Sequence, residues 1–454
     1  MSDGSTKALR EALTEKLAES LAGPLPAGTP RQIHGATGLP GKVSAVIGMR
    51  RAGKTTYVHQ LRRERLAQGV ARQRLPYINF EDERLAALPA GQLGFLLEEY
   101  GRRVPEGAAG EIVTWCFDEI QVVPGWERFA RRLLDTGKAE VIVTGSSAAL
   151  LSREIATALR GRAWAVPLFP FSFAEALSHR GQPVPRDPGF LTGTERAGVE
   201  RLFLEWLAVG GFPEAQALDE PSRGQLLRDY VDVAMLRDVV ERHGVSNVIG
   251  LRWLVRHLLG NAAGLFSVEK FYAALKSQGI AIAKDTVHQL LGYLEDCFLV
   301  RTISMDSSSE RQRMVNPRKA YPVDAGLIPV FDRSGRANIG HALETAVLVE
   351  LERRRRDVTY VRTPGGFEVD FLARGVHGEA ELIQVCADAS DPATAEREVR
   401  ALLEAGTARP EARKRLLTLT RDAAPAETPP GVTVQPAYEW MLGAADDHGT
   451  DTGN

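Results

Sequence analysis

The chain has 454 residues, a formal net charge of −2, 44% hydrophobic residues and 25% charged residues. This composition is ordinary for a globular protein of about three domains and excludes a disordered chain. It also excludes a protein that binds nucleic acid through a large overall positive charge. Cys116, Cys297 and Cys386 lie far apart, which excludes a disulfide framework and a cysteine-based metal site. Because no apolar run approaches the length of a membrane span, we expect a cytoplasmic protein without membrane contact.

The first 170 residues alternate between apolar runs and helical patterns. Residues 1–40 predict an amphipathic helix followed by a connector rich in proline and glycine. From about 41 to 170, apolar strands separated by helical segments favour an α/β fold, with a parallel sheet covered by helices on both faces. The expected strands begin near Val43, Leu75, Glu111, Glu140 and Ala163.

The strand at Val43 leads into the glycine-rich segment GMRRAGKTT at 48–56 and then into a helical pattern. The spacing G-x-x-x-x-G-K-T between a strand and a helix is typical of a phosphate-binding loop (Walker A), with a chance glycine-rich turn as the alternative. Lys54 would reach the β- and γ-phosphates of a nucleoside triphosphate, and Thr55 would offer its hydroxyl to Mg²⁺. For Arg50 and Arg51, contact with the triphosphate and an outward salt bridge are equal alternatives. The residues expected to bind nucleotide are Gly48, Arg51, Gly53, Lys54, Thr55 and Thr56.

A second motif (Walker B) ends the strand near residue 111, where the carboxylates Asp118 and Glu119 follow an apolar run. We expect Asp118 to hold Mg²⁺ and Glu119 to polarise the attacking water as general base, with a helix N-cap as the alternative reading of the pair. The glutamate directly after the aspartate, and the room for an added strand, favour an additional-strand ATPase that hydrolyses its nucleotide. Glu81 and Asp82, after the second strand, are interpreted as a helix cap rather than as catalytic groups.

Hydroxyl side chains follow the next strand, in the run from Thr144 to Ser147. A hydroxyl at that strand end, for which we select Ser146, would contact the γ-phosphate or the attacking water as a sensor. The alternative is an N-cap for the helical pattern that follows.

The remaining chain predicts three further structural segments. Residues 196–262 look helical, and residues 263–332 read helix, turn at Gly279, helix, strand, loop, strand, which is the order of a winged helix-turn-helix. A second α/β unit follows at 333–442, and 443–454 is expected to be disordered. The predicted domains are 1–40 (helix and linker), 41–195 (ATPase core), 196–262 (helical lid), 263–332 (winged helix), 333–442 (second α/β domain) and 443–454 (tail).

The winged-helix segment carries cations that could contact duplex DNA. Asp285, Glu295 and Asp296, in or beside the expected recognition helix, would be repelled by phosphates, so an oligomerisation or packing role is the alternative. The cations are Lys276, Lys284, Arg311, Arg313, Arg318 and Lys319.

The order of these motifs resembles a family of bacterial and archaeal AAA-superfamily ATPases, known mostly as ATP-binding proteins, with a C-terminal domain of unknown function similar to restriction endonucleases. The matching segments are GMRRAGKTT at 48–56, NFEDERL at 79–85, FDEIQ at 117–121, TGSSAALL at 144–151, GRAWAVPLFPFSFAEAL at 161–177, GGFPEA at 210–215, AYPVDAGL at 320–327, LETAV at 343–347 and EVDFL at 368–372.

The resemblance implies roles for residues outside the phosphate loop. In oligomeric AAA-type ATPases, an arginine before the fifth strand reaches the neighbouring subunit's nucleotide as an arginine finger. Arg162 is the first candidate for this role here, and Arg160 is the second. The alternative is that these arginines complement the dipole at the C-terminus of the preceding helix. In the nuclease-like domain, Glu344, Asp370 and Gln384 would be the metal-site residues. Cys386 stands where the family pattern has a lysine, so we expect a degenerate nuclease site that binds nucleic acid or a partner, or is structural.

We therefore expect an ATP-binding protein that hydrolyses ATP with Mg²⁺ and couples this cycle to the winged-helix and nuclease-like domains. A slow nucleotide-gated regulatory module is the alternative, and a metal-dependent nuclease is a third hypothesis. Duplex DNA, a protein partner and a homo-oligomer are all compatible with the sequence.

Overall fold

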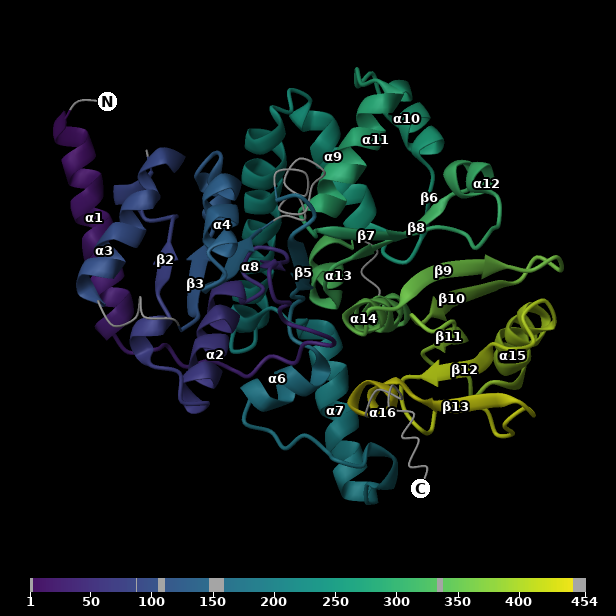
Figure 1. Cartoon of the computed structure of the whole chain (residues 1–454). Coiled ribbons are helices and arrows are strands. Elements are labelled where there is room, and N and C mark those ends of the chain that lie inside the picture. Colours follow the sequence, from purple (N-terminus) through teal and green to yellow (C-terminus); the bar gives the residue numbers. More distant parts are fainter. Residues whose placement is uncertain (1–2, 87, 105–110, 147–158, 333–337, 444–454) are drawn as a thin grey trace. The chain divides into compact units, whose positions relative to one another are not determined.

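The computed structural model describes residues 3–86, 88–104, 111–146, 159–332 and 338–443. The chain forms two compact units (Figure 1), the first made of 1–168 with 296–298 and the second of 169–295 with 299–454. Among the described helices, none is both long and apolar enough to cross a bilayer. The tail expected to be disordered lies, apart from its first residue, outside the described residues, as does most of the helical pattern after Ser146.

The first unit is built around a parallel five-stranded sheet in the order β2-β3-β4-β1-β5. Its strands are β1 (Val43–Ile47), β2 (Tyr77–Asn79), β3 (Val113–Asp118), β4 (Ala139–Gly145) and β5 (Ala163–Pro167). The α/β class and the five expected strands are therefore confirmed. Because β4 separates β1 from β3, the phosphate loop and the carboxylate pair follow strands that are not neighbours.

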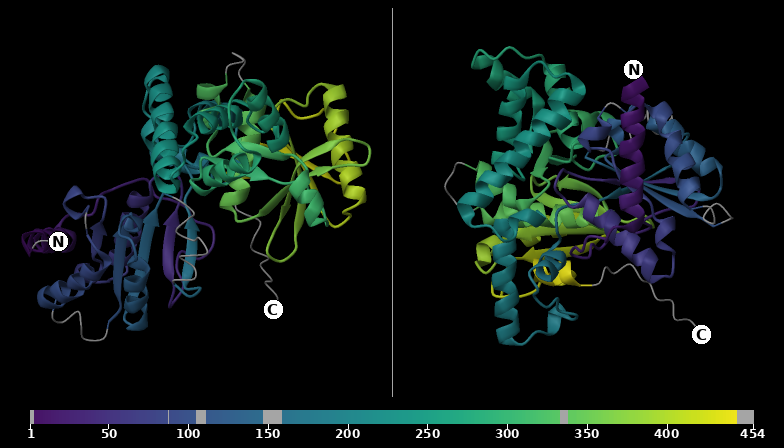
Figure 2. Two further views of the ribbon diagram at one scale, coloured as in Figure 1. Left: turned by 90° about the horizontal axis from the view of Figure 1, so that it is seen from above. Right: turned by 90° about the vertical axis from the view of Figure 1, so that its left-hand side faces the viewer.

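Four described helices of this unit are α1 (Asp3–Ala22), α2 (Lys54–Ala67), α3 (Gly94–Arg103) and α4 (Trp126–Asp135). Figure 2 shows α1, in purple, beside the sheet, where it packs against α3 and β2. The Ser20 hydroxyl accepts a hydrogen bond from the Tyr77 backbone N–H at 2.6 Å, and the Ser20 carbonyl accepts one from Arg62 at 3.0 Å. The N-terminal helix is thus part of the first unit.

The second unit begins with helices. These are α6 (Phe173–His179), α7 (Gly193–Val209), α8 (Glu220–Val233), a π-helical continuation η9 (Ala234–Glu241) and α9 (Val248–Gly260). Ser172 and Thr192 each form a capping box at the start of α6 and α7, which satisfies backbone N–H groups that a helix leaves without partners. The expected helical segment is present.

A small antiparallel sheet follows, in the order β6-β8-β7. The elements here are β6 (Leu265–Phe266), α10 (Val268–Ser277), α11 (Lys284–Asp296), β7 (Val300–Ile303), α12 (Glu310–Val315), β8 (Arg318–Pro322) and α13 (Ile328–Phe331). Gly279 lies between α10 and α11 with φ of 75°, a conformation that glycine adopts without strain. This order agrees with the expected pattern, while its assignment to the winged-helix fold stays a prediction.

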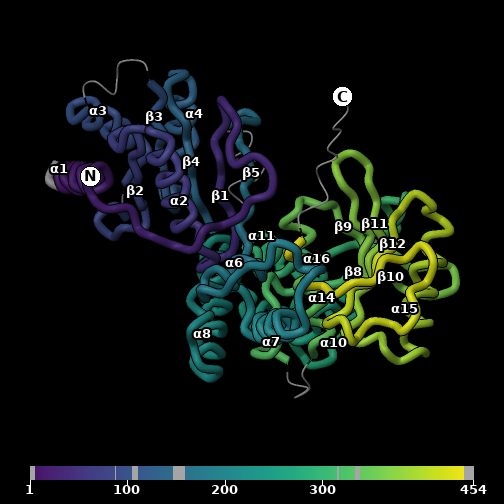
Figure 3. The backbone as a smooth tube through the Cα atoms, turned by 90° about the horizontal axis from the view of Figure 1, so that it is seen from below, coloured from purple at the N-terminus to yellow at the C-terminus, as the bar shows by residue number. Residues whose placement is uncertain are grey.

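The last part of the chain forms a five-stranded sheet in the order β13-β12-β11-β10-β9. Its elements are α14 (Ile339–Arg353), β9 (Asp357–Arg362), β10 (Glu368–Arg374), β11 (Ala380–Cys386), α15 (Pro392–Thr407), β12 (Arg413–Thr418), β13 (Val432–Pro436) and α16 (Ala437–Leu442). Neighbouring strand residues alternate between two cores: Ile383 and Leu417 face α14, whereas Leu382 and Leu416 face α15. The two helices therefore cover opposite faces (Figure 3).

Asp324 joins two of the motifs that carried the family resemblance. Its carboxylate accepts hydrogen bonds from the backbone N–H of Gly211 at 2.7 Å and of Gly326 at 3.0 Å. Burial raises the pKa of Asp324 to about 6. At Gly210, φ is 81° and an added Cβ would lie 1.9 Å from the Asp324 side chain, so only glycine fits at this position.

Candidate functional site

The phosphate loop connects β1 to α2 with the backbone geometry that an anion cradle needs. Gly48 has φ of 155°, and an added Cβ would lie 2.1 Å from the Leu168 carbonyl oxygen, so no larger residue fits there. Arg51 and Gly53 both have left-handed φ, at 66° and 97°. The Lys54 ammonium is buried and donates to the carbonyls of Gly48 at 3.0 Å and Met49 at 3.1 Å, so it lies inside the loop.

Asp118 at the end of β3 is bonded directly to the phosphate-loop threonine. The Thr55 hydroxyl donates to Asp118 Oδ2 at 2.8 Å, which brings together the two residues expected to hold Mg²⁺. Magnesium prefers oxygen ligands, and this pair of a hydroxyl and a buried carboxylate fits that preference.

Two further hydroxyls contact the same carboxylate, and the sequence analysis did not predict either. The Tyr77 hydroxyl on β2 donates to Asp118 Oδ2 at 2.7 Å, and the Thr144 hydroxyl on β4 donates to Asp118 Oδ1. Burial, together with the neighbouring Asp118, raises the pKa of Tyr77, so its hydroxyl remains a donor. Because parallel strands end at the same sheet edge, the place of Thr144 near the end of β4 was an available signal, whereas Tyr77, the first residue of β2, carried none.

Glu119 follows Asp118 in a left-handed conformation with φ of 52°. Its backbone N–H donates to the Thr144 hydroxyl at 2.9 Å, and its carboxylate accepts from the Gln121 amide. Burial raises the pKa of Glu119, and the positive charge of Lys54 partly opposes this shift. A buried carboxylate influenced by the loop lysine is suited to accept a proton from water next to a bound triphosphate.

The structure also locates the other predicted residues of this unit. Ser146 is fully buried after β4, but it is Thr144 that contacts Asp118 and Glu119. Arg162 forms an ion pair with Asp135 at 2.5 Å and keeps 43% of its side chain exposed, so acting on another subunit would require that pair to break.

The acidic and basic residues around the second strand end are explained by local contacts. Asp82 accepts the Arg84 N–H at 3.0 Å and caps a short helix, which confirms the cap interpretation for this residue. Glu81 instead pairs with Arg50 at 3.1 Å, the outward salt bridge that was one of the two alternatives for the loop arginines.

The predicted nuclease residues surround a lysine. Lys319 on β8 is 5% exposed, and its ammonium lies 2.8 Å from Glu344, 2.9 Å from Asp370 and 3.1 Å from Glu368. Tyr321 also donates to Glu344, at 2.8 Å. Among the described residues, no group of three or more His, Cys, Asp or Glu side chains is arranged to hold a metal ion.

Charge balance in this cluster depends on Lys319. Burial alone would lower the pKa of Lys319, but the carboxylates of Asp370, Glu344 and Glu368 outweigh it, and the pKa is raised. Burial and the nearby Asp370 raise the pKa of Glu344 to about 7, although Lys319 opposes the shift.

Gln384 and Cys386, the other two residues considered for the nuclease-like site, bond to neighbouring groups of the same sheet region. The Gln384 side chain accepts from the Asp370 N–H at 3.3 Å and donates to Glu398 at 2.7 Å. The Cys386 thiol donates to the Asp388 carbonyl at 3.1 Å, and burial raises its pKa to about 11.

Comparison with known proteins identifies two segments of the chain. Residues 40–177 match the AAA domain family, and residues 200–335 match a domain family of unknown function, DUF8612. The second match ends where the nuclease-like domain was expected to begin. The chain is 32% identical over 368 residues to the uncharacterized protein MJ1544 of Methanocaldococcus jannaschii, covering 80% of this chain and 78% of that one.

The chain belongs to the MJ1544 family.

A second relative of this MJ1544-family protein is an uncharacterized protein from Haemophilus influenzae, 29% identical over 333 residues and covering 73% of this chain and 79% of that one. Among solved structures, the Walker-type ATPase PABY2304 of Pyrococcus abyssi matches with 17% identity and a TM-score of 0.39, covering 71% of this chain and 95% of that one. From the AAA match and the observed loop and sheet, the first unit of the MJ1544-family protein is an AAA-type P-loop ATPase domain.

Replacing Tyr77 with Phe tests the unpredicted hydroxyl contact in this domain. Since groups that orient metal-binding residues typically contribute 10- to 100-fold to metal affinity, we expect Tyr77→Phe to raise the Mg²⁺ concentration for half-maximal ATP turnover about 10-fold. The measurement is a Mg²⁺ titration of ATP hydrolysis. Tyr100→Phe is the matched control, because its hydroxyl bonds the Gln73 carbonyl at 3.0 Å instead. Equal Mg²⁺ requirements in both variants would contradict the assignment.

Proposed function

We propose that this protein binds ATP in the loop at 48–56 and hydrolyses it with Mg²⁺. The observation that carries the proposal is the 2.8 Å hydrogen bond between Thr55 and Asp118, which joins the phosphate loop to the carboxylate strand across the intervening β4. The AAA match over 40–177 supports the same conclusion independently.

Each residue near the loop has a proposed role. Lys54 exchanges its contacts with the loop carbonyls for the β- and γ-phosphates, which places its charge where negative charge gathers during hydrolysis. Glu119 accepts a proton from the attacking water, and Thr144 holds the backbone of Glu119 beside Asp118. Thr55 and Asp118 would hold Mg²⁺, which neutralises phosphate charge when bound. Ser146 and Arg162 are proposed as sensor and arginine finger.

Slow turnover with signalling by conformation is the second candidate. It is favoured by the state of Glu119, whose carboxylate is already engaged by Gln121 and whose pKa is raised by burial. A hydrogen bond from Gln121 makes this carboxylate a weaker base, which slows proton transfer from water.

The proposed C-terminal module does not act as a nuclease. Its two expected acidic ligands, Glu344 and Asp370, already accept from the buried Lys319 ammonium, and Cys386 provides no cation at the usual lysine position. The module instead supports the winged-helix segment, and the ATP cycle would act on a partner through the second unit.

Steady-state ATP hydrolysis by wild type and Lys54→Ala tests the proposal. A charged hydrogen bond to phosphate contributes about 1.5–3 kcal/mol, so the variant should bind ATP about 10- to 100-fold more weakly. We expect its turnover to be lost at ATP concentrations that saturate the wild type. Lys138→Ala, which removes an exposed lysine of the same unit, should behave as wild type. Wild-type hydrolysis by Lys54→Ala would refute the assignment, and tight binding without wild-type turnover would favour the slow module.

A further inference from the structure

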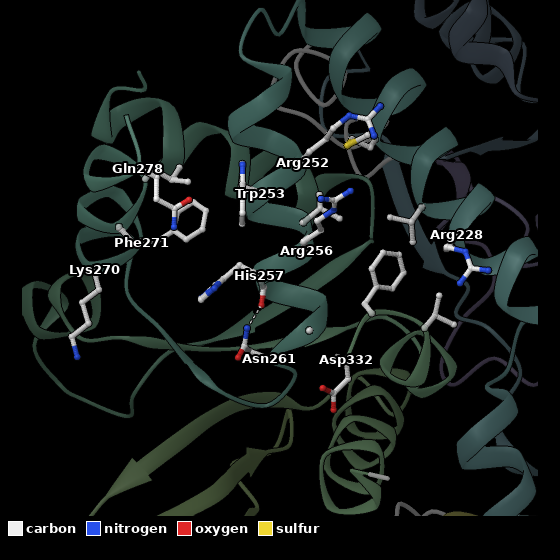
Figure 4. Close-up of a pocket in the computed structure, with 18 of the residues that line it drawn as sticks. Arg228, Arg252, Trp253, Arg256, His257, Asn261, Lys270, Phe271, Gln278 and Asp332 are labelled. Atoms are coloured by element: carbon white, nitrogen blue, oxygen red, sulfur yellow. Dashed lines mark hydrogen bonds between the residues drawn. The ribbon is translucent and has the colours of Figure 1, made fainter. Parts of the chain in front are cut away.

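A hollow of about 840 Å³ lies in the second unit, among α8, α9, α10 and the end of α13. Figure 4 shows Lys270 and Phe271 from α10, with Gln278 just after it, on one side, Arg228 from α8 on the other, and the α9 residues between them. All of its lining residues fall within 228–332, so it is separate from the phosphate loop.

Three of the cations around this hollow have no partner among the described residues. Arg228, Arg256 and Lys270 are exposed, and their side chains have no hydrogen-bond or ion-pair partner among the described residues. Arg252 has a distant carboxylate, Asp232 at 3.8 Å. Elsewhere in the unit buried arginines are paired closely; Arg353, for example, pairs with Glu350 at 3.1 Å. Unpaired cations on three helices around one hollow favour an anionic ligand.

An exposed aromatic ring lies among these cations. Trp253 is 42% exposed on α9, one turn before Arg256, and both line the hollow. Burial lowers the pKa of His257 on the same face, so this histidine is neutral at pH 7 and offers a second planar ring rather than charge. A ligand that satisfies both the cations and the rings must combine negative charges with planar groups.

We propose that this hollow binds single-stranded nucleic acid, with a base stacked on Trp253 and backbone phosphates at Arg228, Arg256 and Lys270. Stacking on an indole requires an exposed base face, which a duplex hides and a single strand offers. A free mononucleotide carries its charge at one end, whereas these cations lie on both sides of Trp253 (Figure 4). Repeated phosphates along a strand match that distribution.

The expected winged-helix surface is less suited to this ligand. Lys284 already pairs with Glu269, Arg313 pairs with Glu310 at 3.1 Å and Arg318 lies 3.8 Å from Glu295. Lys319 is buried in its carboxylate cluster. Of the six cations named for that surface, only Lys276 and Arg311 are exposed without a partner among the described residues.

Fluorescence anisotropy of a labelled oligothymidylate with the full chain, without ATP, tests the proposal. We expect Arg256→Glu to weaken binding about 10-fold or more and to reduce the slope of log affinity against log salt by about 0.7. Trp253→Ala should weaken binding roughly 5-fold or more, whereas Trp253→Phe keeps a ring and should retain most of the affinity. Arg186→Glu is the matched control, since Arg186 is exposed and without a partner among the described residues of the same unit.

Several results would overturn the proposal. Equal weakening by Arg186→Glu and Arg256→Glu would indicate a diffuse charge effect. Another ligand would be indicated if a duplex of equal length bound more tightly than the single strand. The same would hold if free ATP or polyglutamate, at matched charge, displaced the strand. None of these variants alters the phosphate loop, so these outcomes leave the proposed ATP hydrolysis unaffected.

Discussion

Glu119→Gln should keep ATP binding intact while lowering the turnover number about 10²- to 10⁴-fold, the range that a positioned general base contributes. Glutamine has nearly the same shape and can preserve the packing of this buried position, but it cannot accept a proton from water. Lys54, Thr55 and Asp118 are unchanged, so the nucleotide contacts remain. The measurements are ATP affinity by calorimetry and single-turnover hydrolysis of the bound nucleotide.

The pH dependence gives a second readout of the same prediction. Burial raises the pKa of Glu119, and the base is active only when it is ionised. Wild-type kcat/KM should therefore fall with decreasing pH at a higher pH than an ordinary glutamate would give, and Glu119→Gln should lose this acidic limb. Glu83→Gln, at an exposed position of the same unit, is the control. If Glu119→Gln turns over at the wild-type rate, another group activates the water.

Lys319→Met should lower the free energy of unfolding of the second unit by about 3–5 kcal/mol, the usual effect of removing one partner from a buried ion pair. Methionine fills a similar volume, but it leaves Glu344 and Asp370 without their cation, while Glu368 keeps Arg362 at 3.6 Å. Urea unfolding followed by circular dichroism measures the loss. Lys276→Met, at an exposed lysine on α10, should change stability little.

The sign of the pH effect distinguishes this electrostatic cause from a packing defect. In the variant, loss of the lysine charge raises the pKa of Glu344 further above its wild-type value of about 7. Stability from such a group is fully present below its unfolded pKa, near 4.5, and is lost as the pH rises through the folded value. The loss relative to wild type should thus be largest at pH 8 and shrink towards pH 5, and adding Glu344→Gln should recover part of it. A loss independent of pH would contradict the electrostatic cause.

The phosphate-binding half of the candidate site was predictable because its residues lie in contiguous motifs. Thr55 and Asp118 follow expected strands, and parallel strands direct their carboxyl ends to one edge, so their meeting could be anticipated. Tyr77 and Thr144 were not predicted as partners of Asp118. The sequence does not say which strands are neighbours, so the partner of a hydroxyl in or after an apolar run can be identified only once the strand order is known.

Lys319 shows why the rest could not be predicted. Its sequence position suggested an exposed wing cation, and the missing lysine near Cys386 suggested an acidic site without a cation. The structure brings Lys319 to Asp370, 51 positions later, through the packing of two separate sheets. No local pattern encodes this contact. The exposed face of α9 was likewise missed, because Trp253 and Arg256 look like ordinary helix residues until the helices around them are in place.

The position of Lys319 also limits how this protein can be divided. A fragment beginning at α14 would contain Glu344 and Asp370 but not β8, so these two buried carboxyl groups would lose the Lys319 ammonium that pairs with them. The stability of the five-stranded sheet therefore depends on the small sheet. Insertions, deletions or domain exchanges at residue 333 would separate the carboxylates of Glu344 and Asp370 from Lys319, their counterion.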